Sequence, residues 1–241
     1  MKKLQKVLKN KNKIIFLDFE GTETSQEIIA IGAIKGSLDN KLNFKENYKK
    51  FKVFVIPKNP VGKIIESLTN INDDFLKING VYFKNALEKF SNFVGANPEE
   101  YLYVTYGNYD IRLLRNTVLL NKIKNSEVLN SFYKNYFDFS SFLHQFIRRN
   151  NGQYISLKDA LKVFNSTFIG EEHDPLSDAI NLSRLFNLFK NQKNILLTEY
   201  KKTIEHHSNL PTAINKAISL LNENKSISYD EYLKLFEDEL K

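Results

Sequence analysis

The chain has 241 residues, no cysteine, 42% apolar residues and a formal net charge of +7. The lack of cysteine excludes disulfides and thiolate metal sites, and no apolar stretch approaches the roughly 18 residues that span a bilayer. No signal-peptide core follows Met1, so we expect a soluble cytoplasmic protein without a membrane partner. The basic charge favours a polyanionic partner such as nucleic acid, but biased coding towards lysine and asparagine produces the same composition.

Strands are expected in the first part of the chain. The apolar run from Lys13 to Leu17 is typical of a strand that is buried on both faces. Residues 27–35 and 48–57 alternate like the second and third strands of a meander. The preceding segment, 1–12, is lysine-rich, which indicates either a frayed terminus or a contact with phosphates.

Helices alternate with one further strand after the meander. The fourth strand is expected at residues 101–106. The expected helices cover residues 64–71, 82–94, 110–121, 132–149, 156–164 and 176–190. Strands first and helices afterwards predict an α/β fold with helices packed around a mixed sheet.

The pattern loosens after about residue 195, and we expect a helical C-terminal extension over residues 195–241. His206 and His207 are most simply exposed polar surface, and Pro211 is expected to begin a new helix. The last predicted helix has one apolar face, formed by Tyr229, Leu233 and Phe236. This face packs either on the main domain or on a separate protein partner.

The first candidate site lies at the end of the first strand. Asp18 and Glu20 point to one face of this strand, and Phe19 points to the other. Two adjacent carboxylates that lose hydration repel each other, and a hard cation such as Mg²⁺ or Mn²⁺ between them relieves the repulsion. A solvated strand end with two ordinary acids is the alternative. Gly21 and Thr22 follow, and a glycine lets a nucleotide approach the backbone closely.

A second candidate acid begins a predicted helix. Asp110 follows a buried strand, at the carboxyl end of the sheet, where open α/β folds tend to place their sites. A helix-capping role is the alternative for this residue. Its neighbour Tyr109 either stacks on a base or faces the core.

The third candidate cluster combines a histidine with an acid. His173 lies in a loop, Pro175 favours a first helical turn, and Asp178 falls within that turn. The acid can fix a metal while a neutral imidazole accepts a proton from an attacking water. His144, on an expected amphipathic helix, is most simply a surface or half-buried side chain.

Taken together, the three clusters resemble the three exonuclease motifs of the DnaQ-like superfamily, in its histidine-containing DEDDh branch. Three further features are similar to the subset of RNA-trimming exoribonucleases and sporulation-pathway exonuclease-like proteins: the DFEGT form of the first motif, residues 26–33, and residues 68–71. The match covers about residues 13–190. Tyr106 replaces a frequent tryptophan, and Asp174-Pro175 replaces a pair such as arginine-alanine. These departures bear on substrate preference.

The resemblance implies an RNase H-like fold, with an antiparallel meander plus parallel strands flanked by helices, over an exonuclease domain of residues 13–194. It also implies a metal-dependent 3′-to-5′ exonuclease that uses two divalent cations, Mg²⁺ or Mn²⁺. Asp18 would bridge the two ions, Glu20 and Asp178 would complete the tighter site, and Asp110 would hold the second ion through water.

In the same resemblance His173 is the general base that deprotonates the attacking water. The products would be nucleoside 5′-monophosphates from single-stranded or overhanging 3′ ends, with RNA favoured over DNA. The expected substrate-binding residues are Phe19, Gly21, Thr22 and Tyr109. Two alternatives stay open: an exonuclease-fold binding module that docks a protein partner through its C-terminal extension, and a proofreading exonuclease associated with a DNA polymerase.

Overall fold

The computed structural model describes residues 2–8, 11–149, 151–205 and 212–239. The chain divides into two compact units. The first unit contains residues 1–141 and 156–191, and the second contains residues 142–155 and 192–241. Within the described residues, no helix is both long enough and apolar enough to cross a bilayer.

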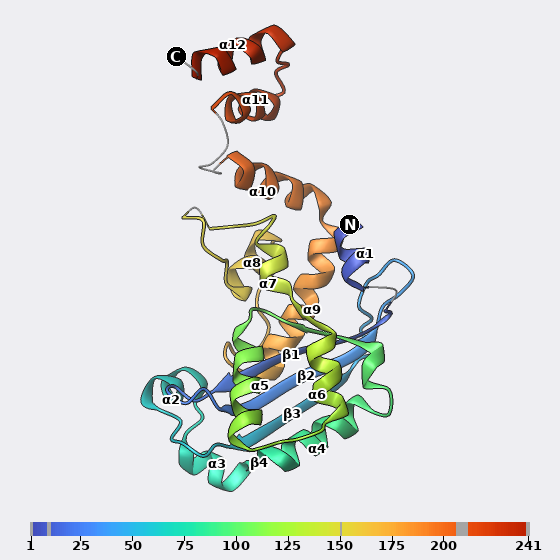
Figure 1. Ribbon diagram of the computed structural model, residues 1–241, viewed down its shortest axis with the longest axis vertical. Coiled ribbons are helices and arrows are strands. Elements are labelled where there is room, and N and C mark those ends of the chain that lie inside the picture. Colours follow the sequence, from blue (N-terminus) through green and yellow to red (C-terminus); the bar gives the residue numbers. More distant parts are fainter. Residues whose placement is uncertain (1, 9–10, 150, 206–211, 240–241) are drawn as a thin grey trace. The chain divides into compact units, whose positions relative to one another are not determined.

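The first unit is built on a mixed sheet whose strand order in the described residues is β4-β3-β2-β1-β5-β6 (Figure 1). The strands are β1 (Lys13–Gly21), β2 (Ile28–Ser37), β3 (Lys49–Ile56), β4 (Val81–Tyr82), β5 (Tyr101–Thr105) and β6 (Tyr136–Asp138). Strands β1 to β3 form an antiparallel meander, β4 runs parallel to β3, β5 to β1, and β6 to β5. The predicted α/β fold with a meander and parallel strands is therefore confirmed.

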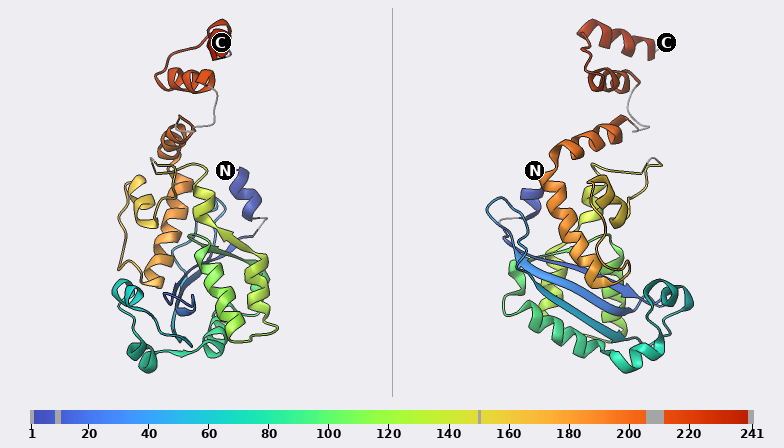
Figure 2. Two further views of the ribbon diagram at one scale, coloured as in Figure 1. Left: turned by 60° about the vertical axis from the view of Figure 1, so that its left-hand side comes forward. Right: turned by 180° about the vertical axis from the view of Figure 1, so that it is seen from behind.

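Helices cover both faces of this sheet. Those of the first unit are α1 (Lys2–Leu8), α2 (Lys63–Thr69), α3 (Asp73–Asn79), α4 (Phe83–Val94), α5 (Tyr109–Leu120), α6 (Glu127–Lys134), α8 (Leu157–Val163) and α9 (Pro175–Asn191), with a short 3₁₀ turn at Pro98–Glu100. Helices α5 and α6 lie in front of the sheet in Figure 1, and α9 lies on the opposite face, seen from behind in Figure 2. The fold is thus a three-layer α/β arrangement.

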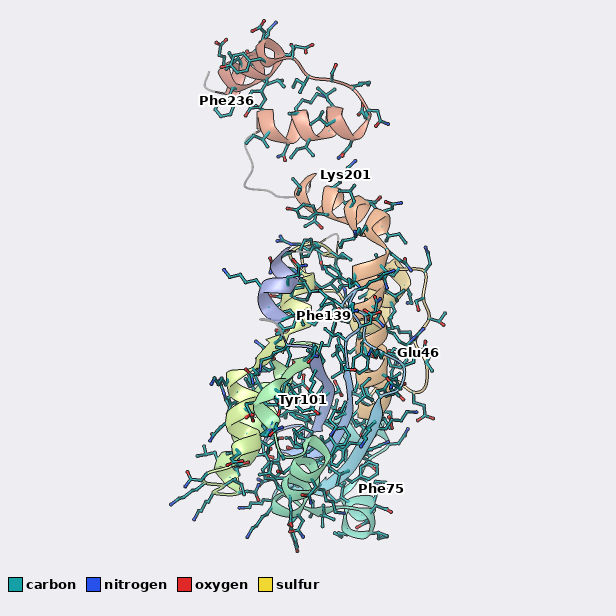
Figure 3. All side chains as sticks on the ribbon, turned by 90° about the vertical axis from the view of Figure 1, so that its right-hand side faces the viewer. Glu46, Phe75, Tyr101, Phe139, Lys201 and Phe236 are labelled. Carbon is teal, nitrogen blue, oxygen red and sulfur yellow. The ribbon has the colours of Figure 1, made fainter. Side chains whose placement is uncertain are left out.

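The alternation of β1 divides its side chains between the two layers. Ile15, Leu17 and Phe19 pack into the core that α4, α5 and α6 cover. Phe16 points the other way and meets Phe186 of α9, with ring centroids 5.4 Å apart. Figure 3 shows the side chains that fill the space between the layers, around the fully buried Phe139. Asp18 and Glu20 have the parity of Phe16, so the pleat directs both carboxylates towards the α9 side.

A glycine lets α9 approach the sheet. Gly32 of β2 is the register partner of Asp18. A Cβ atom at Gly32 would lie 2.1 Å from the carbonyl carbon of Pro175 and 2.2 Å from the amide nitrogen of Leu176. The first turn of α9 therefore rests on bare backbone, which brings it beside Asp18.

Two sequence predictions need correction. The helix expected at residues 132–149 is wrong, because α6 ends at Lys134, β6 follows, and α7 covers only Phe139–Leu143. Residues 136–138 pair with residues 103–105 of β5, so tertiary pairing overrides the helical periodicity there. The apolar stripe predicted at residues 64–71 is only partly buried: Ile64 and Leu68 are exposed on α2, whereas Ile65 and the buried Ile71 pack in a small hydrophobic cluster.

The second unit consists of helices and one irregular segment. Its helices are α10 (Lys193–Glu205), α11 (Thr212–Asn222) and α12 (Tyr229–Glu239), which confirms a helical C-terminal part. The Thr203 hydroxyl on α10 donates to the Phe146 carbonyl at 3.0 Å, and His144 stacks on Tyr154 with ring centroids 3.9 Å apart. The expectations for His206, His207 and Pro211 lie outside the described residues.

The apolar face predicted for the last helix is present on α12. Tyr229, Leu233 and Phe236 are all exposed, and Phe236 is labelled on this helix in Figure 3. What covers this face stays a prediction.

Substituting Gly32→Ala should destabilise the protein, because the new methyl group has no space against the backbone of α9. We expect a loss of about 1–3 kcal/mol in the free energy of unfolding, measured with urea. The exposed Lys50 of β3 offers a matched control, because Lys50→Ala should change this free energy by less than about 0.5 kcal/mol. A Gly32→Ala variant as stable as the parent would contradict the close approach.

Candidate active site

Three carboxylates from two elements meet on the α9 side of the sheet. Asp18 and Glu20 come from the end of β1, and Asp178 comes from the first turn of α9. One carboxylate oxygen from each lies within 4.8 Å of the other two. Such a set of hard oxygen donors fits a divalent cation of the Mg²⁺ or Mn²⁺ kind, and its acidic charge would compensate such an ion.

Helix α9 is fixed at its start by Asp174. Oδ1 of this residue accepts hydrogen bonds from the amides of Leu176 at 3.1 Å and Ser177 at 2.9 Å, which satisfies two free N–H groups of the first turn. The backbone N–H of His173 is near enough to the Asp178 carboxylate to favour its ionised form and lower its pKa, against the larger effect of burial. The loop before α9 thus orients the acid that follows it.

Asp110 stands beside the three carboxylates and outside their ligand cluster. It is buried in the first turn of α5, and its Oδ1 accepts a 2.8 Å hydrogen bond from the Phe19 amide, between Asp18 and Glu20. The N-cap position of α5 is Asn108, and the Asp110 carboxylate instead binds β1 directly. This bond holds α5 and β1 at the site in a fixed relation.

Burial and repulsion from neighbouring acids raise the pKa of all four carboxyl groups. Loss of hydration is the largest cause of the shift at each position. At Asp18 the charges of Asp110, Asp178 and Glu20 add to it and hold the pKa well above its usual range. The pKa of Glu20 rises to about 8. For Asp110 and Asp178 the pKa rises to about 7. Such a cluster carries negative charge that a cation would stabilise.

His173 lies at the edge of the cluster. Its backbone has a left-handed φ of 63°, and its side chain is 50% exposed. The Nδ1 atom is 3.9 Å from Oε1 of Glu20, which is beyond a hydrogen bond but near enough to face the acids. The imidazole therefore has access both to solvent and to the carboxylates.

Three of the four expected substrate-binding residues have contacts within the protein. The Phe19 ring stacks on Phe132 in the core, with centroids 6.2 Å apart. A Cβ atom at Gly21 would lie 2.3 Å from a methyl carbon of Leu113, so close packing on α5 explains this glycine. The hydroxyl of the buried Thr22 accepts from the Glu27 amide at 2.9 Å. Their contact with a substrate stays a prediction.

The fourth expected residue, Tyr109, has an accessible ring. It is 37% exposed, and the Arg112 guanidinium carbon lies 5.3 Å from its ring centroid. Its hydroxyl is near enough to Glu20 and Asp110 to be influenced by their charges. An aromatic ring with an attached cation beside the acids suits stacking on a nucleotide base.

Sequence reasoning missed the residues that hold the loop before α5. The amide of Gly107, at a left-handed φ of 120°, donates to Asp138 Oδ1 at 3.1 Å. The Gly107 carbonyl accepts from the hydroxyls of Tyr136 at 2.7 Å and Thr105 at 2.8 Å. Because residues 132–149 were expected to be one helix, no sequence signal placed Tyr136 and Asp138 at this loop.

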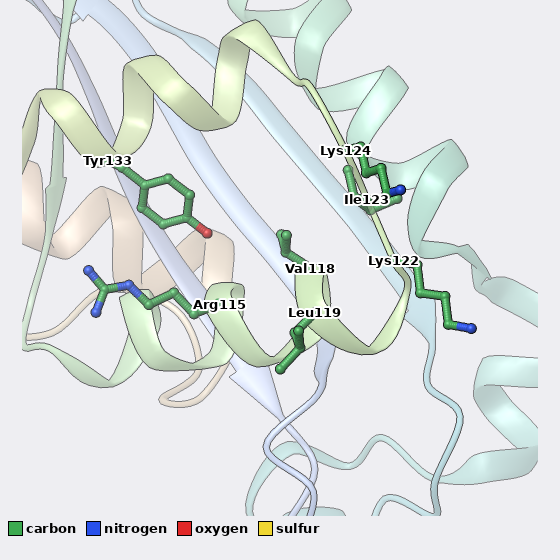
Figure 4. A pocket seen from close by; sticks show the side chains of 7 residues that line it. All are labelled: Arg115, Val118, Leu119, Lys122, Ile123, Lys124 and Tyr133. Atoms are coloured by element: carbon green, nitrogen blue, oxygen red, sulfur yellow. The ribbon is translucent and has the colours of Figure 1, made fainter.

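A separate groove of the first unit lies away from these acids. It is formed by α5, α6 and their connection, as Figure 4 shows. Its lining residues are Arg115, Val118, Leu119, Lys122, Ile123, Lys124 and Tyr133. None of the four acids or His173 lines this groove, so the candidate site rests on side-chain geometry and charge.

Comparison with known proteins agrees with this fold. The family model described as Exonuclease (RNase_T) matches residues 15–186, and no curated protein sequence matches. The chain therefore belongs to this exonuclease family, in agreement with the resemblance of its motifs to DnaQ-like exonucleases.

Solved structures with a similar fold include three informative ones. The nuclease domain of 3′hExo, a DEDDh family member bound to rAMP, has 20% identity and a TM-score of 0.61, covering 76% of this chain and 94% of that one. A 3′-exonuclease that recognises the histone mRNA stem-loop has 20% identity and a TM-score of 0.61, with 79% and 70% covered. E. coli Exonuclease I in complex with a dT13 oligonucleotide has 14% identity and a TM-score of 0.54, with 80% and 45% covered.

The raised pKa values predict how the metal-free protein responds to pH. Between about pH 4 and pH 8 the folded acids hold more protons than the unfolded ones, so the free energy of unfolding should fall as pH rises. Urea unfolding with EDTA at about pH 5.5 and about pH 8 should show a lower midpoint at the higher pH.

Other groups also titrate in this range, so a variant isolates the cluster. Glu20→Gln removes one charge at nearly constant shape and should flatten the pH dependence relative to the parent. Saturating Mg²⁺ should stabilise the parent most at the higher pH, where the carboxylates are ionised. The same pH dependence in parent and Glu20→Gln would contradict the account of the pKa shifts.

Proposed function

We propose that this protein is a metal-dependent 3′-to-5′ exonuclease that releases nucleoside 5′-monophosphates from nucleic-acid 3′ ends. The observation that carries the proposal is the meeting of Asp18, Glu20 and Asp178 within one ligand cluster, in a chain of the Exonuclease family. Burying like charges in this way costs stability, which a site for cations would explain.

The chain's own carboxylates would hold the cations. Asp18, Glu20 and Asp178 form the cluster for one ion, and Asp110 beside Phe19 is placed to support a second, with Asp18 shared between them. Two bound divalent ions would activate water and stabilise the charge on the entering and leaving oxygens of the phosphodiester. Among Mg²⁺ and Mn²⁺, the oxygen donors do not favour one over the other.

His173 would act as the general base. Its half-exposed imidazole faces Glu20, and only its neutral form can accept a proton from water. The His173 backbone N–H lies near the Asp178 carboxylate, so the loop carries the imidazole beside the acids. Proton transfer to His173 would generate the hydroxide that attacks the phosphorus of the last phosphodiester. The bond from this phosphorus to the 3′ oxygen of the preceding nucleotide breaks, and that oxygen takes up a proton to become the new 3′ hydroxyl.

We propose RNA as the favoured substrate, with a single-stranded or overhanging 3′ end. The DFEGT form of the first motif supports RNA through its resemblance to exoribonucleases. Two similar structures concern rAMP and an mRNA stem-loop, whereas that of Exonuclease I contains a DNA oligonucleotide. The Tyr109–Arg112 pair would stack on the terminal base. We place this activity in the cytoplasm.

A second candidate function is a binding module with weak nuclease activity. The exposed apolar face of α12 favours this candidate, because unburied apolar side chains at helical spacing suit a protein partner. Deleting residues 196–241 distinguishes the two candidates: an exonuclease keeps its turnover, and a recruited module loses its partner.

Asp18→Asn should abolish turnover and leave the fold intact, since it removes a ligand charge at nearly constant shape. The loss of several kcal/mol of charge stabilisation lowers the rate by about a thousand-fold or more. His173→Ala should lower the rate by about a hundred-fold or more and retain cation binding. Trimming of end-labelled oligonucleotides gives the rates, and calorimetry gives the affinity for Mn²⁺.

Asp74 of α3 is an exposed acid and provides the matched control. Asp74→Asn should trim at the parental rate. Full activity of Asp18→Asn would reject the assignment of the acids, and activity that survives EDTA would reject the metal requirement.

The RNA preference is tested by digesting RNA and DNA oligonucleotides of the same sequence, single-stranded and with 3′ overhangs. We expect faster release from single-stranded RNA, with nucleoside 5′-monophosphates identified by mass spectrometry. Equal or faster digestion of DNA would contradict the preference and leave the nuclease assignment standing.

A further inference from the structure

Resting on the proposed function, we propose that Lys52 and Asp174 form a positioning pair that holds the His173 loop and the start of α9 in their active arrangement. Lys52 lies on β3, and its Nζ contacts Oδ2 of Asp174 directly before α9. Neither side chain touches the scissile bond in this proposal. Both act through His173 and Asp178.

The strand register explains why Lys52 reaches the site. Asp18 of β1, Gly32 of β2 and Lys52 of β3 are register partners in one row across the meander. Directly paired residues of neighbouring antiparallel strands point to the same face of a sheet. Lys52 therefore projects from the same face as Asp18, and the glycine between them leaves room for the first turn of α9.

The two ends of this row both interact with the first turn of α9 or the residue before it. On one side Asp178 joins Asp18 and Glu20 in the ligand cluster. On the other side Asp174 is bound by Lys52. The contact with Gly32 sets how closely the helix approaches the sheet, and the ion pair limits its sliding and rotation along it.

Asp174 has two separate tasks, one for each oxygen. Oδ1 caps α9 through the amides of Leu176 and Ser177, and Oδ2 binds Lys52. The residue between this carboxylate and the rest of the loop is His173, in its left-handed conformation. A conformation of this kind needs support from its surroundings in a non-glycine residue.

The pair is better protected than its neighbours on the surface. The side chains of Lys52 and Asp174 are 31% and 25% exposed, against 44% and 47% for the pair between Lys158 of α8 and Glu172 of the loop before α9. The Lys52 ammonium also lies 5.1 Å from the ring centroid of Phe54, which further restricts its position. Less exposed pairs with fixed geometry contribute more than solvated ones.

The test is a double-mutant cycle with Lys52→Met and Asp174→Asn. Methionine keeps the apolar stem of the lysine, and asparagine keeps an oxygen that can cap α9. Each single variant should lower kcat on a single-stranded RNA oligonucleotide by about ten-fold to a hundred-fold, because a small misplacement of reacting groups is costly in rate. The double variant should lose no more than the worse single variant, since both remove the same interaction.

Three further variants separate positioning from strand binding and from general charge. Lys52→Arg keeps the ion pair and should restore kcat to within about three-fold of the parent. Lys50→Met removes a charge two positions away on the same strand. Lys158→Met removes the more exposed ion pair between Lys158 and Glu172. Both should leave kcat within about two-fold of the parent.

Hydrogen exchange of the metal-free protein provides a readout that is independent of turnover. The backbone N–H groups of residue 174 and residues 176–178 should exchange faster in Lys52→Met and Asp174→Asn than in the parent and in Lys158→Met. If the parent trims no oligonucleotide, the proposed function fails, and this exchange still tests the pair.

Three results would overturn the positioning role. The first is an unchanged kcat in Lys52→Met. The second is a double variant in which the losses of the two single variants, as free energies, simply add. The third is a higher KM with unchanged kcat, which would make Lys52 a contact for the nucleic-acid strand. Unchanged exchange at residue 174 and residues 176–178 would equally overturn the mechanical part of the proposal.

Discussion

The close contact between Gly32 and the first turn of α9 is the constraint on which the site depends. Pro175 and Leu176 occupy the space that a side chain at position 32 would fill. Because Gly32 pairs with Asp18, this contact delivers Asp178 to the two carboxylates of β1. A larger residue there would separate the acids and leave the rest of the sheet little changed.

The cluster that results is unfavourable by itself. Four acids whose pKa values are raised by burial and mutual repulsion work against folding at neutral pH. The surrounding structure holds them in place through the Phe19–Asp110 hydrogen bond, the cap of α9 and the bonds on Gly107. Proteins accept such local conflicts where function requires them, and in the proposed function a bound cation would convert the conflict into binding energy.

The parts that sequence predicts well are those encoded locally. Strand alternation places Asp18 and Glu20 on one face, a helix start places Asp110, and Pro175 places Asp178 in a first turn. Contacts between distant segments are harder to predict. Because one helix is expected at 132–149, β6 and its hydrogen bonds to Gly107 are not predicted. Lys52 comes near Asp174 because of the register of three paired strands, which no local pattern encodes. For Gly21 the sequence suggests room for a ligand, and the structure adds close packing against Leu113, which no local pattern indicates.

A crystal structure of the protein grown with Mn²⁺ tests the central claim most directly, because anomalous scattering locates the ions without reference to activity. Our account predicts an anomalous peak within coordination distance of Asp18, Glu20 and Asp178, and a second one on the Asp110 side of Asp18. Ordered side chains at these acids without any peak between them, in crystals that bind Mn²⁺ elsewhere, would contradict it.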